Sequence, residues 1–211
     1  MPGPTRILLV RHGESTWNAD GRWQGQADPP LTARGRAQAR AAAAALPPVD
    51  RVVASDLRRA HATAVLLAGD RPVEVDVGLR ERDAGAFSGL RRREIHERHP
   101  GLLPDDPARA PGTEGDGLVP PPGWEPDEEL GRRAWAALDR LVAALGGAGT
   151  GLAVSHSGLI YALETDLGAP RERIANLGGR WFVHDGDRWS LGARLHLLAP
   201  DEETATPRDQ L

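Results

Sequence analysis

Near its start the chain reads Ile7-Leu8-Leu9-Val10-Arg11-His12-Gly13-Glu14-Ser15-Thr16-Trp17-Asn18. The first four of these residues are apolar and rich in branched side chains, which is typical of a buried strand. The strand leads directly into Arg11 and His12, and Gly13 allows the backbone to turn sharply. In open α/β sheets, ligands bind just beyond the carboxyl ends of the strands. This stretch therefore indicates a functional site, although a basic strand end facing solvent is the alternative for the tripeptide alone.

Length and composition narrow the classes of protein to consider. The 211 residues suit a single α/β domain, and the absence of cysteine excludes disulfides and thiolate metal sites. A net charge of −4 argues against broad nucleic-acid binding. No apolar run approaches the ~18 residues of a membrane span, and residues 1–6 lack the apolar segment of a signal peptide. We therefore expect a cytoplasmic protein that binds neither membrane nor nucleic acid.

Strand and helix patterns alternate along the chain. Strands are predicted at residues 7–10, 51–54, 73–77, 151–155 and 193–198, and a hairpin is predicted to pair 181–184 with 188–191. Helices are predicted after an N-cap at Thr32, over 57–67 after a cap at Ser55 and Asp56, over 91–99, from Pro126 onward, and up to Leu167. The order predicts a three-layer α/β sandwich, with helices on both faces of a mostly parallel sheet and an antiparallel edge.

Two segments do not fit this alternation. The proline- and glycine-rich stretch 100–126 is predicted to be a lid or cap loop of the domain formed by residues 1–211. Residues 200–211 are predicted to be a loose polar tail.

Polar side chains follow three of the predicted strands. Arg11 and His12 follow the first strand, Arg58 and Arg59 lie in the first turn of the helix after the second, and His156 follows the fourth. If these strands are neighbours, two histidines and two arginines meet beside helix N-termini. Guanidinium groups and helix N-termini both favour phosphate oxygens. Two histidines could instead bind a metal, but the arginines would repel a divalent cation, so we expect neither metal nor cofactor.

Four blocks of sequence, taken in order, resemble the motifs of the histidine phosphatase superfamily, which includes phosphoglycerate mutases. Any one block would be a weak signal, but the ordered set spans nearly the whole chain. The blocks are residues 11–18, residues 55–64, Leu79-Arg80-Glu81 followed by Gly85 and Gly89, and Val154-Ser155-His156-Ser157-Gly158.

The resemblance implies a covalent phosphohistidine mechanism. His12 is then the nucleophile, and Arg11, Arg59 and His156 stabilise charge on the phosphoryl oxygens. The register of the block at 55–64 implies Arg59 rather than Arg58 for this role. Nearby cations should lower the pKa of His12, and its other ring nitrogen must donate to a backbone carbonyl. Glu81 is the expected general acid and base. A surface acid is the alternative interpretation of Glu81, with Asp83 as the second candidate for the role.

The resemblance also suggests which residues contact the substrate. Asn18, Gln24, Gly25 and Ser157 are the expected substrate-binding residues. Trp17 and Trp23 are predicted to be packing residues rather than a binding platform. Exposed charges are the favoured interpretation of Arg82, the run 91–93 and Arg109, and binding of a second anionic group of the substrate is the alternative.

Three functions remain open at this point. The loop 24–32 resembles the phosphatase form, and the stretch between Glu81 and His156 is shorter than in most mutases. These features favour a metal-independent phosphatase acting on a small phosphate ester, over a phosphoglycerate-type mutase. The pair Glu81-Arg82 is similar to the mutases, and Gly123-Trp124-Glu125-Pro126 departs from the usual phosphatase motif. A non-catalytic phospholigand sensor would need neither nucleophile nor acid. An edge-strand homodimer also remains open.

Overall fold

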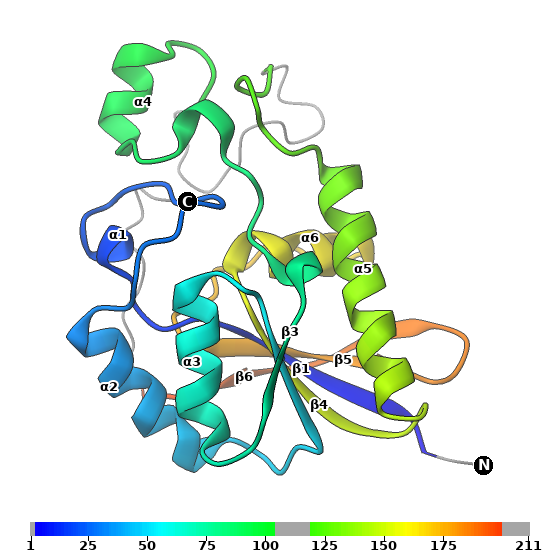
Figure 1. Ribbon diagram of the computed structural model, residues 1–211. Helices are drawn as coiled ribbons and strands as arrows, with labels where there is room; N and C mark the ends of the chain where they lie inside the picture. Colours follow the sequence, from blue (N-terminus) through cyan, green and yellow to red (C-terminus); the bar gives the residue numbers. More distant parts are fainter. Residues whose placement is uncertain (1–2, 104–118, 200–211) are drawn as a thin grey trace.

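The computed structural model describes residues 3–103 and 119–199 (Figure 1). The predicted lid therefore lies partly, and the predicted tail wholly, outside the described residues. In chain order the elements are β1 (Thr5–Arg11), α1 (Thr16–Ala19), α2 (Ala33–Ala42), η1 (Ala43–Ala45), β2 (Arg51–Ala54), α3 (Arg58–Ala68), β3 (Val73–Val75), η2 (Val77–Leu79), η3 (Gly85–Phe87), α4 (Arg92–Arg98), α5 (Asp127–Ala144), β4 (Gly149–Ser155), α6 (Ser157–Asp166), β5 (Gly178–His184) and β6 (Trp189–His196).

The strands form one six-stranded sheet in the order β3-β2-β4-β1-β5-β6. The pairs β3–β2, β2–β4 and β4–β1 are parallel, whereas β5 and β6 add antiparallel pairs on one side of β1. The predicted mixed α/β architecture is confirmed. Because β1, β2 and β4 are parallel neighbours, their carboxyl ends meet at one edge of the sheet.

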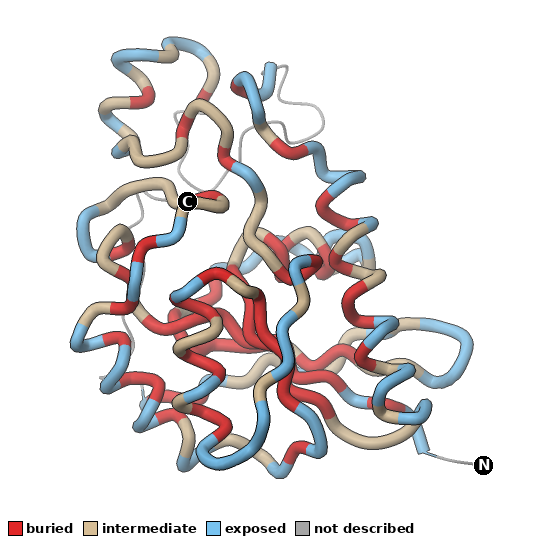
Figure 2. Tube along the Cα trace, in the orientation of Figure 1, coloured by how far each residue is buried: buried red, intermediate tan, exposed pale blue. Residues whose placement is uncertain are grey.

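The two faces of the sheet bury alternate residues, as the two-residue repeat of a strand requires. Ile7 and Leu9 of β1 belong to a cluster with α5 and α6, whereas Leu8 and Val10 pack with α2 and α3. Figure 1 shows these helix pairs on opposite sides of the strands, and Figure 2 shows the central strands buried. Both faces of β1 are covered, which explains why residues 7–10 are uniformly apolar.

Two helix starts can be compared with the predictions. Thr32 caps α2 as predicted, since its hydroxyl accepts the N–H of Gly35. The predicted cap at Ser55 and Asp56 is wrong, because α3 begins at Arg58 and its first N–H donates to Asp28 at 2.6 Å. The carboxylate of Asp28, from a distant loop, thus accepts an N–H at the start of α3, where Ser55 or Asp56 was expected to cap the helix.

The end of the sheet also differs from the prediction. The separate strands predicted at 188–191 and 193–198 are one strand, β6, which pairs with β5 through a bulge near Phe182. A side chain at Gly192 would come within 2.8 Å of Cβ of Trp181. Gly192 therefore allows close approach of two strands rather than ending one. The strand predicted at 73–77 is shorter, since β3 ends at Val75.

The described segments on either side of residues 104–118 form a small apolar cluster. Phe87, Ile95 and Leu103 are buried there, and Trp23 and Trp124 pack against them. Among the described residues, no helix has the length and apolarity needed to cross a bilayer.

Candidate active site

The parallel strand ends bring four of the predicted site residues together. Arg11 ends β1, and the backbone N–H of His12 donates to the carbonyl of Ser155 at the end of β4. His156 follows directly, with its ring centroid 5.1 Å from that of His12. Arg59, in the first turn of α3, reaches the same place from beside β2.

His12 is held in one orientation and one tautomer. Its Nδ1 lies 2.6 Å from the carbonyl oxygen of Gly13, which can only accept, so Nδ1 carries the proton. Its Nε2 therefore has a lone pair, and Nε of Arg59 donates to it at 3.2 Å. Burial lowers the pKa of His12 well below its usual value, and the charges of Arg59 and Arg11 lower it further. The ring is thus neutral and nucleophilic near neutral pH.

The two arginines are buried and anchored to backbone carbonyls. Arg59 donates to the carbonyls of Ala27 and Gly25 at 2.7 and 2.8 Å, and Arg11 donates to that of Ile174 at 2.9 Å. Burial lowers the pKa of Arg59 to about 10, which leaves it charged at neutral pH. Neither side chain pairs with a carboxylate among the described residues, so both charges remain available for an anion.

His156 has two ring nitrogens without a hydrogen-bond partner, although the residue is fully buried. An unpartnered buried polar group is costly, so two such atoms beside His12 suggest a function. Burial lowers the pKa of His156 well below its usual value, with further contributions from Arg59, His12 and Arg133. Its placement beside His12 fits a neutral donor to a phosphoryl oxygen.

Glu81 enters the site beside the first turn of α6. Its carboxylate accepts the N–H of Gly158 at 3.1 Å and that of Arg82 at 2.8 Å. Asp83, the second candidate for the acid, is used elsewhere: its carboxylate accepts the N–H of Gly85 in a turn. The geometry thus favours Glu81 over Asp83.

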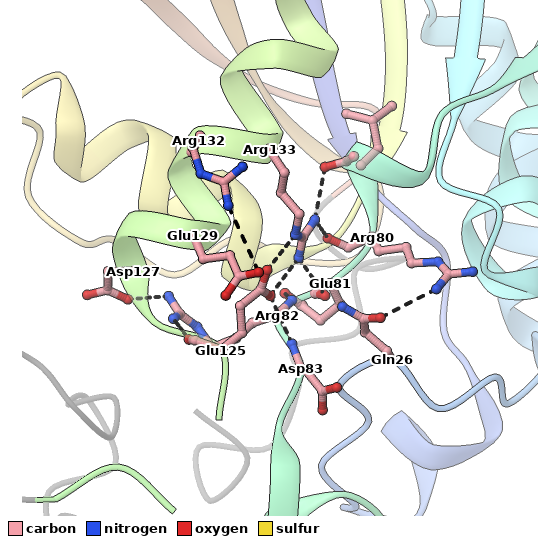
Figure 3. A network of polar contacts seen from close by, with 12 residues as sticks. Gln26, Arg80, Glu81, Arg82, Asp83, Glu125, Asp127, Glu129, Arg132 and Arg133 are labelled. Atoms are coloured by element: carbon pink, nitrogen blue, oxygen red, sulfur yellow. Dashed lines mark hydrogen bonds and ion pairs between the residues drawn. The ribbon is translucent and has the colours of Figure 1, made fainter. Parts of the chain in front are cut away.

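The backbone of the Glu81 loop is held by Arg133, which the sequence analysis did not identify. Arg133 projects from α5 and donates to the carbonyls of Gly78, Arg80 and Glu81 at 2.9, 2.6 and 2.9 Å. It also forms a two-point ion pair with Glu125, at 2.6 and 2.8 Å (Figure 3). Burial favours the neutral form of Glu125, but Arg133 lowers the pKa of Glu125 below its usual value.

The predicted substrate-binding residues surround one cavity of about 400 Å³, together with Arg11, His12, Arg59 and Glu81. Asn18, Gln24, Gly25 and Ser157 all line it. Gln24 accepts the hydroxyl hydrogen of Ser15 at 2.7 Å. Gly25 has φ of 49°, and a side chain there would come within 2.6 Å of the backbone of Ala84, so this position requires glycine.

The outer end of the cavity contains residues that the sequence analysis missed or misjudged. Trp23 was predicted to be a packing residue only, but it also lines the cavity, beside Trp124. Of the arginines considered for a second anion but favoured as exposed charges, Arg82 lines the cavity, the run 91–93 does not, and Arg109 lies outside the described residues. Tyr161, Thr165 and Arg171 are additional lining residues. No local motif marks them, because their role depends on how α6 and the following loop are placed.

Comparison with known proteins agrees with the fold and the residue pattern. The chain is 38% identical over 186 residues to a glucosyl-3-phosphoglycerate phosphatase of Mycolicibacterium vanbaalenii, covering 82% of this chain and 79% of the relative. It is 36% identical over 165 residues to a metal-independent phosphoserine phosphatase of Arabidopsis thaliana, covering 75% and 67%. A mycobacterial glucosyl-3-phosphoglycerate phosphatase solved with VO3 superposes with a TM-score of 0.72 at 31% identity, covering 89% and 97%. The family profile matches residues 7–192, and the chain belongs to the histidine phosphatase superfamily, branch 1.

Proposed function

We propose that this protein is a phosphomonoesterase that hydrolyses a small phosphorylated metabolite through a phosphohistidine intermediate on His12. The observation that carries this proposal is the lone pair on Nε2 of His12, which is presented beside two buried arginines. Relatives named as phosphatases of glucosyl-3-phosphoglycerate and of phosphoserine support small phosphorylated metabolites as the substrate class.

The first half-reaction transfers the phosphoryl group to His12. The lone pair on Nε2 forms the P–N bond while the P–O bond to the leaving group breaks, and Glu81 gives a proton to the departing oxygen. Arg11, Arg59 and His156 surround the place where the equatorial oxygens would lie and stabilise their charge. Arg59 Nε already points at Nε2 and is positioned for a phosphoryl oxygen.

The second half-reaction returns the enzyme to its starting state. Glu81, now a carboxylate, takes a proton from water as the water oxygen forms a new P–O bond and the P–N bond breaks. No step requires a metal, since fixed positive charge supplies the stabilisation that a cation would otherwise give.

The test is a panel of phosphate esters assayed with and without chelator, on the unmodified protein, on His12→Ala and on the control His61→Ala. We expect chelator-resistant release of phosphate that falls at least about 10³-fold in His12→Ala and persists in His61→Ala. Rapid quench during turnover should trap an acid-labile, alkali-stable phosphoryl group on His12. Hydrolysis without that adduct would refute the mechanism, and faster isomerisation than hydrolysis of phosphoglycerates would indicate a mutase.

A further inference from the structure

The active-site cavity continues well beyond the groups that handle the phosphoryl group. Arg11, His12 and Arg59 line its inner end, whereas Tyr161 and Arg171 line it from α6 and the loop that follows. A leaving group attached to the phosphate would extend toward these outer residues. The chemistry of these outer residues therefore indicates which leaving group the substrate carries.

Arg171 is held over an aromatic ring. Its guanidinium carbon lies 4.8 Å from the centroid of the Tyr161 ring, while the arginine itself remains exposed to the cavity. The Tyr161 hydroxyl accepts the N–H of Ile174 at 2.9 Å, and the carbonyl of Ile174 accepts from Arg11, also at 2.9 Å. Stacking leaves the edge of the guanidinium free to donate. The same short segment thus ties Arg171 to the phosphate end.

The other arginines at the outer end already have partners. Arg82 pairs with Asp127 and donates to the carbonyl of Glu125, and Arg22 pairs with Glu94. No carboxylate forms an ion pair with Arg171 within the parts of the chain that the structure describes. Two aspartates, Asp127 and Asp166, also line this end of the cavity. Because Asp127 pairs with Arg82 and Glu94 pairs with Arg22, Arg171 is the arginine here whose charge is not already paired among the described residues.

We propose that Arg171, stacked on Tyr161, binds a carboxylate on the leaving group of the substrate. The inference rests on the proposed phosphatase function and specifies its substrate class as a phosphate ester of a carboxylic acid. One unpaired guanidinium matches the single charge of a carboxylate better than a second phosphate dianion. The planar fork of a guanidinium also fits the two oxygens of a carboxylate.

Direct binding to the His12→Ala variant tests this without turnover. Calorimetry would compare two matched ligand pairs that differ only in a carboxylate and a hydroxymethyl group: 3-phosphoglycerate with glycerol 3-phosphate, and 6-phosphogluconate with glucitol 6-phosphate. In the second pair the carboxylate lies farther from the phosphate along the ligand. We expect the carboxylate ligand to bind about ten- to a hundredfold more tightly in at least one pair, as a charge-assisted contact would provide.

Variants of the arginine then decide its role. In the His12→Ala background, Arg171→Met should abolish the preference, Arg171→Lys should retain part of it, and the neighbouring Arg173→Met should retain all of it. A preference that Arg171→Met leaves intact, or no preference in either pair, overturns the inference. The phosphatase proposal is judged separately, by hydrolysis with an intact His12.

Discussion

Replacing Arg133 by Met should lower both the melting temperature of the protein and the catalytic contribution of Glu81, and further variants should separate the two effects. Arg133 is 18% exposed and Glu125 is 8% exposed, so the substitution leaves a nearly buried carboxylate without its cation. Removing one partner of a buried ion pair costs about 3 kcal/mol or more. At about 2–4 °C per kcal/mol for a chain of this size, we expect the melting temperature to fall by about 6–12 °C.

The effect on catalysis should depend on the leaving group. Arg133 holds the carbonyls of three residues at and before Glu81, so its loss frees the loop that places the acid. A displacement of about 1 Å can cost about 10²-fold in rate. An alkyl phosphate needs a proton on its leaving oxygen, whereas p-nitrophenyl phosphate does not. Glu81 also acts in the second half-reaction, which both esters share, so the comparison uses kcat/KM, which reports the step in which the leaving group departs. We therefore expect Arg133→Met to lower kcat/KM much more for an alkyl phosphate, as Glu81→Gln should.

Two further variants complete the test. The adjacent Arg132 is 72% exposed and reaches Glu129 only at 4.0 Å, so Arg132→Met should change neither property. The double variant Arg133→Met/Glu125→Leu removes both charges and should regain part of the stability without regaining kcat/KM on the alkyl ester. Equal losses of kcat/KM on both esters in folded Arg133→Met, or no loss, would refute the view that Arg133 acts through Glu81.

Other expectations follow from single contacts. A Cβ at Gly158 would lie 2.4 Å from the Glu81 carboxylate, so Gly158→Ala should lower kcat at least about tenfold with an unchanged melting temperature; unchanged kinetics would contradict this. Because the pKa values of His12 and His156 are lowered in the fold, the unfolded chain binds more protons as pH falls below about 6.5. Urea titrations should show stability falling by up to about 1.4 kcal/mol per pH unit for each histidine, and less steeply in His156→Gln. Glu164 is fully buried between Arg194 and Arg180, yet burial raises its pKa in spite of both arginines, so Glu164→Gln should cost less than about 1 kcal/mol of unfolding free energy, and a loss of about 3 kcal/mol or more would contradict that account.

The phosphate end of the site could be predicted because strand order and local motifs determine it. Arg11 and His12 follow an apolar run typical of an interior strand, and Arg59 and His156 follow other strands of the same parallel set. The protonated Nδ1 of His12 followed from the chemistry of a nucleophile, and Gly13 provides the expected carbonyl. The main cause of its lowered pKa was not foreseen, since burial contributes more than the arginines.

The rest could not be predicted because it depends on long-range packing. Asp28 caps α3 across 30 residues, and Arg133 reaches back more than 50 residues to the Glu81 loop. Nothing in the local sequence distinguishes Arg133 from Arg132 beside it, although one is a buried clamp and the other an exposed charge. Their positions on α5 cause the difference, because two consecutive residues of a helix point in different directions, so that Arg133 faces the core and Arg132 faces solvent.

The inner end of the cavity is fixed by the sheet and its outer end by a loop, and this difference bears on how the substrate specificity of such an enzyme can change. The residues proposed to perform chemistry lie at strand ends and helix starts, where the sheet fixes them. Arg171 lies in the connection between α6 and β5, which the sheet does not constrain. Changes in that loop can therefore alter which leaving group is bound while the phosphoryl end stays intact. The same catalytic motif is then compatible with many substrates, and the identity of the substrate must be sought in the loops.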